Sequence, residues 1–249
     1  MPQLKGYHRP ASVGEALELL ARPGVQTTII GGGTRIVAQL DAPVDEVVDL
    51  QAAGLDEVEY SAEGLRLGAM VRLQAIVEDD QAPALLREAA RREGPNTFRH
   101  AATIGGTVAQ PDPSSELLAA LLVFEAEVEI ERVSDGAKRM LLSDFLADVP
   151  AHLAGGIITA VRLATTGRTA GDRVGRTPAD QPIVAAAARR TEQGKLYLAL
   201  AGVGPAPVLV EPGQVARLNP AGDFRGSGEY RRQMAVLLAK RVMNEVAIT

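Results

Sequence analysis

The sequence predicts a mixed fold of α-helices and β-strands, because three kinds of pattern occur along its 249 residues. A β-branched strand runs directly into a glycine turn at residues 27–33. Alternating segments turn back as hairpins at 57–70 and 126–142, and an amphipathic helix begins at Glu229. With 46% hydrophobic and 23% charged residues, the composition is that of a globular protein with a sizeable core. We expect one large domain or two modest ones.

The first fifty residues predict a small α/β unit. Ser12 and Glu15 form a capping box, which predicts a helix from Val13 to about Arg22 that Pro23 and Gly24 stop. Further along, the pattern predicts strands at 27–30 and 44–50, with one or two helical turns between them at 34–40. The glycine turn therefore follows the carboxyl end of the first strand.

The rest of the chain predicts hairpins, short helices and a long final helix. Helices are expected near 73–77 and 83–92, and a third strand pair at 183–190 and 196–202. One face of the final helix is expected to carry Tyr230, Met234, Leu237, Leu238, Val242 and Val246. The segment 164–182 is rich in Thr, Gly, Arg and Asp, which is typical of a linker or a long functional loop. We therefore expect a boundary near residue 165.

Composition excludes several classes of function. The net charge of -5 argues against a nucleic-acid-binding protein, and no apolar run approaches the roughly 20 residues of a membrane span. The N-terminus lacks the pattern of a signal or transit peptide, so we expect a cytoplasmic protein. The chain has no cysteine, which excludes disulfides, thiol nucleophiles and cysteine-ligated clusters within it. The three histidines lie far apart, and we expect no metal site.

The first glycine segment is the run Ile30, Gly31, Gly32, Gly33 and Thr34. A strand that ends in three glycines exposes consecutive backbone N–H groups, and no Cβ blocks the approach of an anion. The run is not a Rossmann fingerprint, because Ile36 stands where the third glycine belongs, and no Gly-Lys-Ser/Thr follows as in a Walker A loop. Taken alone, the run is explained equally well as a flexible β-to-α turn that binds no ligand.

The second glycine segment is the run Thr103, Ile104, Gly105, Gly106 and Thr107. A helix is expected after it, with Asp112 as N-cap and Pro113 in the first position. Glu116 falls in the first turn, where the helix dipole alone would favour an acid; its other possible role is to accept hydrogen bonds from ligand hydroxyls. Two such segments favour a diphosphate ligand, although their spacing does not identify it.

In this order, the motifs resemble the FAD-binding medium subunit of molybdenum hydroxylases, the flavoprotein subunit of carbon monoxide dehydrogenase and bacterial xanthine dehydrogenase. The resemblance covers nearly the whole chain. It rests on the two glycine segments and the acidic helix after the second, and on weaker matches at 7–12, 48–50, 67–69, 173–176 and 230–232.

The resemblance implies an α+β fold in two parts. Residues 1–165 would form a two-subdomain FAD-binding domain, with a small α/β unit at about 1–52 and a mixed or antiparallel sheet at 53–165. Residues 166–249 would form a small C-terminal domain of sheet and helices.

The resemblance also implies an oxidoreductase subunit. Electrons would pass from iron–sulfur clusters on a small partner subunit through FAD to NAD⁺, oxygen or a quinone-type acceptor, while a molybdopterin large subunit oxidises the substrate. A chain without cysteine suits that division, because cluster and molybdenum must lie on separate chains.

Site residues follow from the resemblance position by position. Residues 30–34 would form the first FAD loop, and residues 103–107 the second, with backbone amides on the diphosphate. Ile104 would cover the flavin, and Glu116 stands where the family has an FAD-bonding Asp. No catalytic acid or base is expected, because the flavin carries the chemistry.

Several positions depart from the family pattern. Arg35 replaces a usual Leu, Thr107 an Asn and Gly171 an aromatic, and further departures are Ile30, Gly33, Gln110 and Glu116. Arg35 and Thr107 favour the alternative of a flavin-free subunit kept for assembly or scaffolding. An unrelated nucleotide-using enzyme is disfavoured, because both standard phosphate-loop motifs are missing.

Overall fold

The computed structural model describes residues 4–35 and 44–247. These residues form two compact units, each built from three stretches of chain. The first unit takes Met1–Ala75, Asn96–Gln110 and Glu127–Arg162, and the second takes Ile76–Pro95, Pro111–Ala126 and Leu163–Thr249. The first boundary falls inside helix α2 (Leu73–Glu78).

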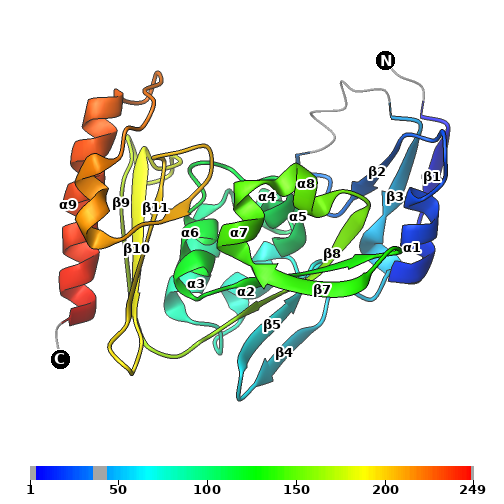
Figure 1. Cartoon of the computed structure of the whole chain (residues 1–249), viewed down its shortest axis with the longest axis horizontal. Helices are drawn as coiled ribbons and strands as arrows, with labels where there is room; N and C mark the ends of the chain where they lie inside the picture. Colours follow the sequence, from blue (N-terminus) through cyan, green and yellow to red (C-terminus); the bar gives the residue numbers. More distant parts are fainter. Residues whose placement is uncertain (1–3, 36–43, 248–249) are drawn as a thin grey trace. The chain divides into compact units, whose positions relative to one another are not determined.

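The first unit begins with the predicted α/β arrangement. Its three-stranded parallel sheet has the order β1-β3-β2, with strands β1 (Gly6–His8), β2 (Thr27–Ile30) and β3 (Glu46–Asp49) (Figure 1). Helix α1 (Val13–Leu20) begins where the capping box predicts, and the Ser12 hydroxyl accepts a hydrogen bond from the Glu15 amide. Ala16 and Leu17 of this helix pack with Val48 in one core cluster. Most of the helical segment expected at 34–40 lies outside the described residues.

A five-stranded sheet of order β4-β5-β8-β6-β7 forms the rest of the first unit's framework. Its strands are β4 (Val58–Ser61), β5 (Gly64–Gly68), β6 (Glu127–Arg132), β7 (Gly136–Leu141) and β8 (Gly156–Leu163). The hairpins β4–β5 and β6–β7 confirm the two predicted hairpins. Strand β8, which sequence patterning missed, lies between them and is buried along almost its whole length.

Short helices complete this part of the chain. They are 3₁₀ turn η2 (Leu50–Ala52) and helices α4 (Asn96–Arg99), α5 (Ile104–Ala109), α7 (Leu142–Ala147) and α8 (Val149–Leu153). Helix α5 includes residues 104–107 of the second glycine segment, and Thr103 is its N-cap.

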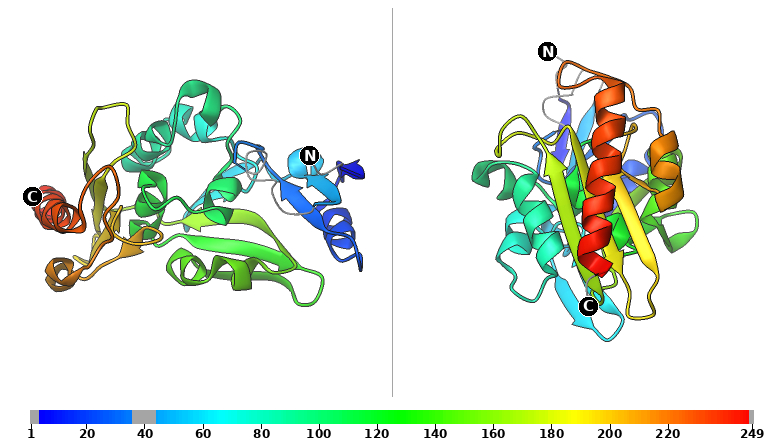
Figure 2. Two further views of the ribbon diagram at one scale, coloured as in Figure 1. Left: turned by 90° about the horizontal axis from the view of Figure 1, so that it is seen from above. Right: turned by 90° about the vertical axis from the view of Figure 1, so that its left-hand side faces the viewer.

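The second unit is a four-stranded antiparallel sheet with helices on both faces. Its order is β12-β11-β10-β9, with strands β9 (Arg168–Val174), β10 (Val184–Arg190), β11 (Leu196–Ala201) and β12 (Val208–Leu209). Helix α9 (Gly228–Ala247) runs along one face, and α6 (Glu116–Val123) lies on the other beside α3 (Ala84–Arg92) (Figures 1 and 2). The 3₁₀ turn η3 (Pro212–Arg217) contacts α9.

Strand β10 is apolar along most of its length. Val184 and the four alanines after it are all buried, because helices cover both faces of the strand. A strand buried on both sides has a continuous apolar sequence rather than an alternating one. The predicted pair β10–β11 is confirmed over a six-residue register.

The expectation of a linker or long loop at 164–182 was wrong for its central part. Residues 168–174 form strand β9, which pairs with β10 over seven residues. Thr, Gly, Arg and Asp in such a segment favour a loop when only the local sequence is considered. Strand β9 forms nevertheless at the edge of the sheet, because β10 supplies the hydrogen-bond partners of its backbone.

Two details of the predicted helices were also wrong. The helix after the second glycine segment begins at Glu116 with Ser115 as N-cap, because Asp112 instead accepts a hydrogen bond from the Ser114 amide in a preceding turn. In α9, Leu237 is exposed, and Arg231 is among the buried residues of the helix.

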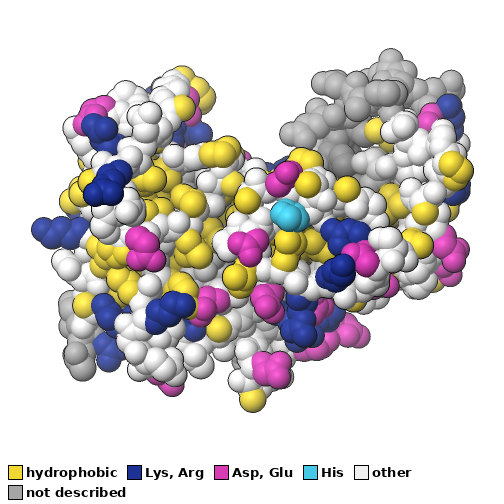
Figure 3. All heavy atoms as spheres, viewed as in Figure 1, with side chains coloured by type: hydrophobic (Ala, Val, Ile, Leu, Met, Phe, Trp, Pro, Cys, Tyr) yellow, Lys and Arg dark blue, Asp and Glu magenta, His cyan; other side chains and the backbone are white. Residues whose placement is uncertain are grey.

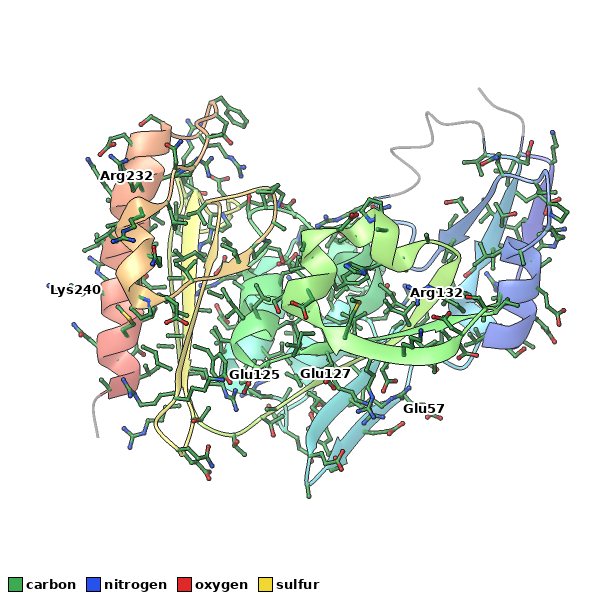
Figure 4. All side chains as sticks on the ribbon, viewed as in Figure 1. Glu57, Glu125, Glu127, Arg132, Arg232 and Lys240 are labelled. Carbon is green, nitrogen blue, oxygen red and sulfur yellow. The ribbon has the colours of Figure 1, made fainter. Side chains whose placement is uncertain are left out.

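The carboxyl end of α6 is held by Arg189 of β10. The buried guanidinium donates to the carbonyl oxygen of Val123 at 3.2 Å and to Glu125 Oε2 at 3.0 Å. Glu125, labelled in Figure 4, has a positive φ of 54° and also accepts a hydrogen bond from Tyr197. Arg189 thereby satisfies acceptors that the helix end would otherwise leave open.

The surface carries charges of both signs. On the face of the described residues seen in Figure 3, Lys and Arg alternate with Asp and Glu, and no extended basic surface is visible. Among the described helices, none is both long and apolar enough to cross a membrane.

Candidate functional site

The two glycine segments meet in the first unit and form the walls of one pocket. Its volume is about 430 Å³, and its described lining comes from residues 31–35 on one side and from 98–110 on the other. The lining residues are Gly31, Gly32, Gly33, Thr34, Arg35, Phe98, Ala102, Thr103, Gly106, Thr107, Ala109 and Gln110. Residues about seventy positions apart thus form one concave site, as a shared ligand would require.

The first segment offers backbone donors at the end of β2. A Cβ at Gly32 would overlap the carbonyl oxygen of Ala101, and Gly33 has a φ of +70°, a conformation that L side chains rarely adopt. Within the described part of the chain, the amides of Gly32 and Gly33 have no hydrogen-bond partner. Glycine is therefore required here by close approach at one residue and by backbone conformation at the next.

In the second segment, the backbone amides of residues 104–107 already donate hydrogen bonds within the protein. Thr103 caps α5, and its Oγ1 accepts a hydrogen bond from the Gly106 amide at 3.1 Å. The amides of Ile104, Gly105 and Thr107 donate to the carbonyl oxygens of Val71, Ala69 and Thr103. The Thr107 hydroxyl also donates to Thr103 O at 3.1 Å. This segment therefore contributes a small, close-packed wall rather than a row of open donors.

Seven of the eleven predicted site residues line the pocket: Gly31, Gly32, Gly33, Thr34, Thr103, Gly106 and Thr107. Ile30, Ile104 and Gly105 do not. Ile104 is fully buried, and a Cβ at Gly105 would lie 2.7 Å from that of Ala69, so this glycine serves close packing against the backbone before α2.

Sequence reasoning missed Arg35 as a site residue. Its side chain lines the pocket, and Nη1 donates to the carbonyl oxygen of Gln110 at 2.6 Å. The sequence feature that points to Arg35 is its position just after the glycine turn. The family resemblance marks this residue only as a departure from the usual Leu.

The last predicted residue, Glu116, belongs to the second unit, at the start of α6. Its Oε2 accepts a hydrogen bond from Arg92 at 3.1 Å. Its Oε1 lies 3.3 Å from Arg173 Nη1, an ion-pair distance without hydrogen-bond geometry, so this buried oxygen has no hydrogen-bond partner. Burial raises the pKa of Glu116, and the two guanidinium groups oppose that rise.

Glu116 also lines a pocket of about 680 Å³ within the second unit, together with Arg92, Leu85 and Gly171. A Cβ at Gly171 would lie 2.7 Å from Leu85 Cδ1. Leu85 of α3 therefore occupies the space that a side chain at position 171 would need, which accounts for glycine there.

Comparison with known proteins gives one family. The family described as "FAD binding domain in molybdopterin dehydrogenase" matches residues 2–165. The chain is 29% identical over 250 residues to protein YgfM of Escherichia coli (strain K12), covering 94% of this chain and 93% of that protein. It is 28% identical over 274 residues to the carbon monoxide dehydrogenase medium chain of Afipia carboxidovorans, covering 95% and 94%.

The fold also matches a solved structure over nearly its full length. The chain aligns with a chain of carbon monoxide dehydrogenase from Hydrogenophaga pseudoflava with a TM-score of 0.87 and 23% identity, covering 99% of this chain and 98% of that one. This likeness confirms the predicted α+β class.

Proposed function

Because the chain belongs to the family of FAD-binding domains in molybdopterin dehydrogenases, we propose that it carries electrons through FAD from iron–sulfur clusters on a partner chain to an external acceptor. Family membership confirms the medium subunit of molybdenum hydroxylases, its FAD cofactor and the oxidoreductase class that the motifs predicted. When bound, FAD supplies the redox chemistry, and the protein binds and orients it.

The observation that carries this proposal is the glycine-walled pocket of the first unit. Phosphate oxygens approach consecutive backbone amides most easily where no Cβ intervenes, and Gly32 and Gly33 provide two such amides without partners in the described part of the chain. Across the pocket, Gly106 and the Thr103 hydroxyl leave room for the same group. These residues fit the diphosphate of FAD.

We assign the diphosphate to the pocket-lining residues of both glycine segments. In this assignment the first segment, Gly31 to Thr34, supplies donors, while Thr103, Gly106 and Thr107 supply space and shape. The predicted contacts of Ile30, Ile104 and Gly105 with the cofactor stay predictions.

For Glu116 we propose the role of accepting hydrogen bonds from hydroxyl groups of the cofactor. Its buried Oε1 has no hydrogen-bond partner among the described residues, and Arg92 and Arg173 hold the carboxylate in place. A buried acceptor that is fixed in position and has no partner can accept a hydrogen bond from a hydroxyl group of a bound ligand.

We further propose that an iron–sulfur small subunit and a molybdopterin large subunit are separate partner chains. Two observations support this: the chain has no cysteine to ligate a cluster, and a relative that the alignment covers to 94% is named a medium chain. The domain division at residue 165, with subdomains at about 1–52 and 53–165 and a C-terminal domain at 166–249, is part of the same proposal. The family match ends at residue 165, which supports it.

An absorption spectrum of the purified full-length chain, before and after addition of FAD, tests the proposal. We expect a flavin spectrum with one extractable FAD per chain. A protein that stays colourless with excess FAD would contradict it and favour the flavin-free assembly subunit. For the partners, affinity purification from the native host should recover a cysteine-rich small chain and a large molybdenum-containing chain, and recovery of this chain alone would contradict that part.

A further inference from the structure

Among the described residues that line the pocket between the glycine segments, Arg35 carries the single charged side chain, and none of these residues is Asp or Glu. We propose that the Arg35 guanidinium binds the diphosphate of the cofactor, as a specificity residue that selects a phosphate-bearing ligand. This inference rests on the proposed function, because it concerns the same pocket. It adds a charged contact to a site otherwise built from backbone amides and hydroxyl groups.

The position of the side chain supports this role. Arg35 follows directly after the turn that carries the unpartnered amides of Gly32 and Gly33, so its backbone emerges at the same pocket wall. From there the side chain reaches the opposite wall, where Nη1 donates to Gln110 O at 2.6 Å. Gln110 is the C-cap of α5, and carbonyl groups at a helix end lack helical partners. The guanidinium is thus held beside the pocket by an acceptor that the fold leaves available.

The chemistry of the pocket favours an anion over a neutral ligand. A diphosphate carries two negative charges, and a guanidinium offers several N–H donors in a plane that matches phosphate oxygens. A neutral isoalloxazine or adenine ring would gain little from this cation at the pocket wall. Arg35 should therefore contribute to the affinity for FAD and for ADP, but not to that for riboflavin, which has no phosphate.

The test uses the full-length chain stripped of bound flavin, and three variants of it. Arg35→Gln removes the charge, Arg35→Lys keeps the charge without the planar group, and Arg139→Gln removes an exposed cation of the same unit outside the pocket. Dissociation constants for FAD and riboflavin are measured by fluorescence titration, and the constant for ADP by competition with FAD, each at low and high KCl. Circular dichroism and thermal melting verify that each variant is folded.

For Arg35→Gln we expect the dissociation constants of FAD and ADP to rise by the same factor, about 10- to 100-fold, with riboflavin unchanged. The KCl dependence of FAD binding should become flatter, because one screened charge pair is lost. Arg35→Lys should lie between wild type and Arg35→Gln, and Arg139→Gln should match wild type.

Other outcomes separate this inference from the proposed function. If wild type binds FAD and Arg35→Gln binds it equally well or more tightly, the inference is wrong and the proposed function stands. If riboflavin loses affinity by the same factor as FAD, Arg35 shapes the pocket instead of contacting the diphosphate, which also overturns the inference. If wild type itself binds no FAD, the proposed function fails and the inference with it.

Discussion

The backbone of Gly32 lies so close to Ala101 that a Cβ on Gly32 would overlap the Ala101 carbonyl oxygen. This contact joins the end of β2 to the residues just before α5 within the first unit. It brings both glycine segments to one pocket and explains why neither can be treated as an independent loop.

We predict that Gly32→Ala destabilises the protein and abolishes FAD binding. The new methyl group meets backbone rather than a mobile side chain, so the two segments must move apart, at a cost of about 1–3 kcal/mol in the free energy of unfolding. Urea denaturation and FAD titration measure the two effects. Gly14→Ala is the control, because its Cβ would make only an ordinary van der Waals contact, 3.9 Å from Ser12 Oγ, and alanine favours a helix. Equal stability of Gly32→Ala and wild type would show that the close approach is absent in solution.

We predict that Gly106→Val weakens FAD binding at least about tenfold while the free energy of unfolding changes by less than about 1 kcal/mol. A Cβ at this position lies 3.0 Å from the Thr103 Oγ1 side-chain oxygen, which can adjust, but the added methyl groups enter the pocket. FAD titration and urea denaturation measure the two quantities. Gly213→Ala, where nothing lies within 4 Å of the new Cβ, is the control for loss of a glycine. Unchanged FAD affinity would place the cofactor elsewhere.

We predict that Glu116→Gln changes how stability depends on pH. Burial raises the pKa of Glu116 in the folded state above its ordinary value of 4.5. Above pH 4.5, the folded chain therefore holds a proton that the unfolded chain has released, and the contribution of this group to stability falls as pH rises through the folded-state pKa. Glutamine has no such titration.

Urea denaturation of wild type and Glu116→Gln between pH 4 and pH 8, without FAD, measures this effect. The free energy of unfolding of the variant, minus that of wild type, should increase with pH and then level off. Parallel curves over the whole range would mean that Arg92 and Arg173 fully offset the burial of the carboxylate.

We predict that Arg189→Ala lowers the free energy of unfolding by about 2–4 kcal/mol. The substitution leaves the Val123 carbonyl oxygen and the Glu125 carboxylate without the guanidinium that now binds both. Arg241→Ala is the matched control: its ion pair with Asp172 is exposed, and such pairs contribute less than about 1 kcal/mol. Chemical denaturation should show a clearly larger loss in the free energy of unfolding for Arg189→Ala than for Arg241→Ala. Equal losses in the two variants would refute the stabilising role of the buried Arg189.

Local signals account for the parts of the structure that were predicted correctly. The start of α1 depends on Ser12 and Glu15, three residues apart, and the hairpins depend on alternation around a short turn. The glycine segments were predicted for the same reason. A position that has no room for a Cβ requires glycine, and that glycine is visible in the sequence itself. Motif order then indicated the family, which the match over residues 2–165 confirmed.

Contacts between distant residues account for what was missed. Strand β9 has a loop-like composition and forms only because β10 supplies its hydrogen-bond partners; β8 is likewise defined by the neighbours that bury it. Arg231 is buried in α9 because its guanidinium donates to the carbonyl oxygens of Ile183 and Gly202, which no helical period reveals.

The sequence by itself thus determined the elements with local signatures, the family and the two segments of the candidate site. Only the tertiary structure decided that these segments share one pocket, that the amides of the second are already in use, and that Arg35 reaches Gln110 across it. The physical reason is that a cap, a turn or a glycine requirement acts within a few residues, whereas a pocket lining and its charge depend on atoms that only folding brings together.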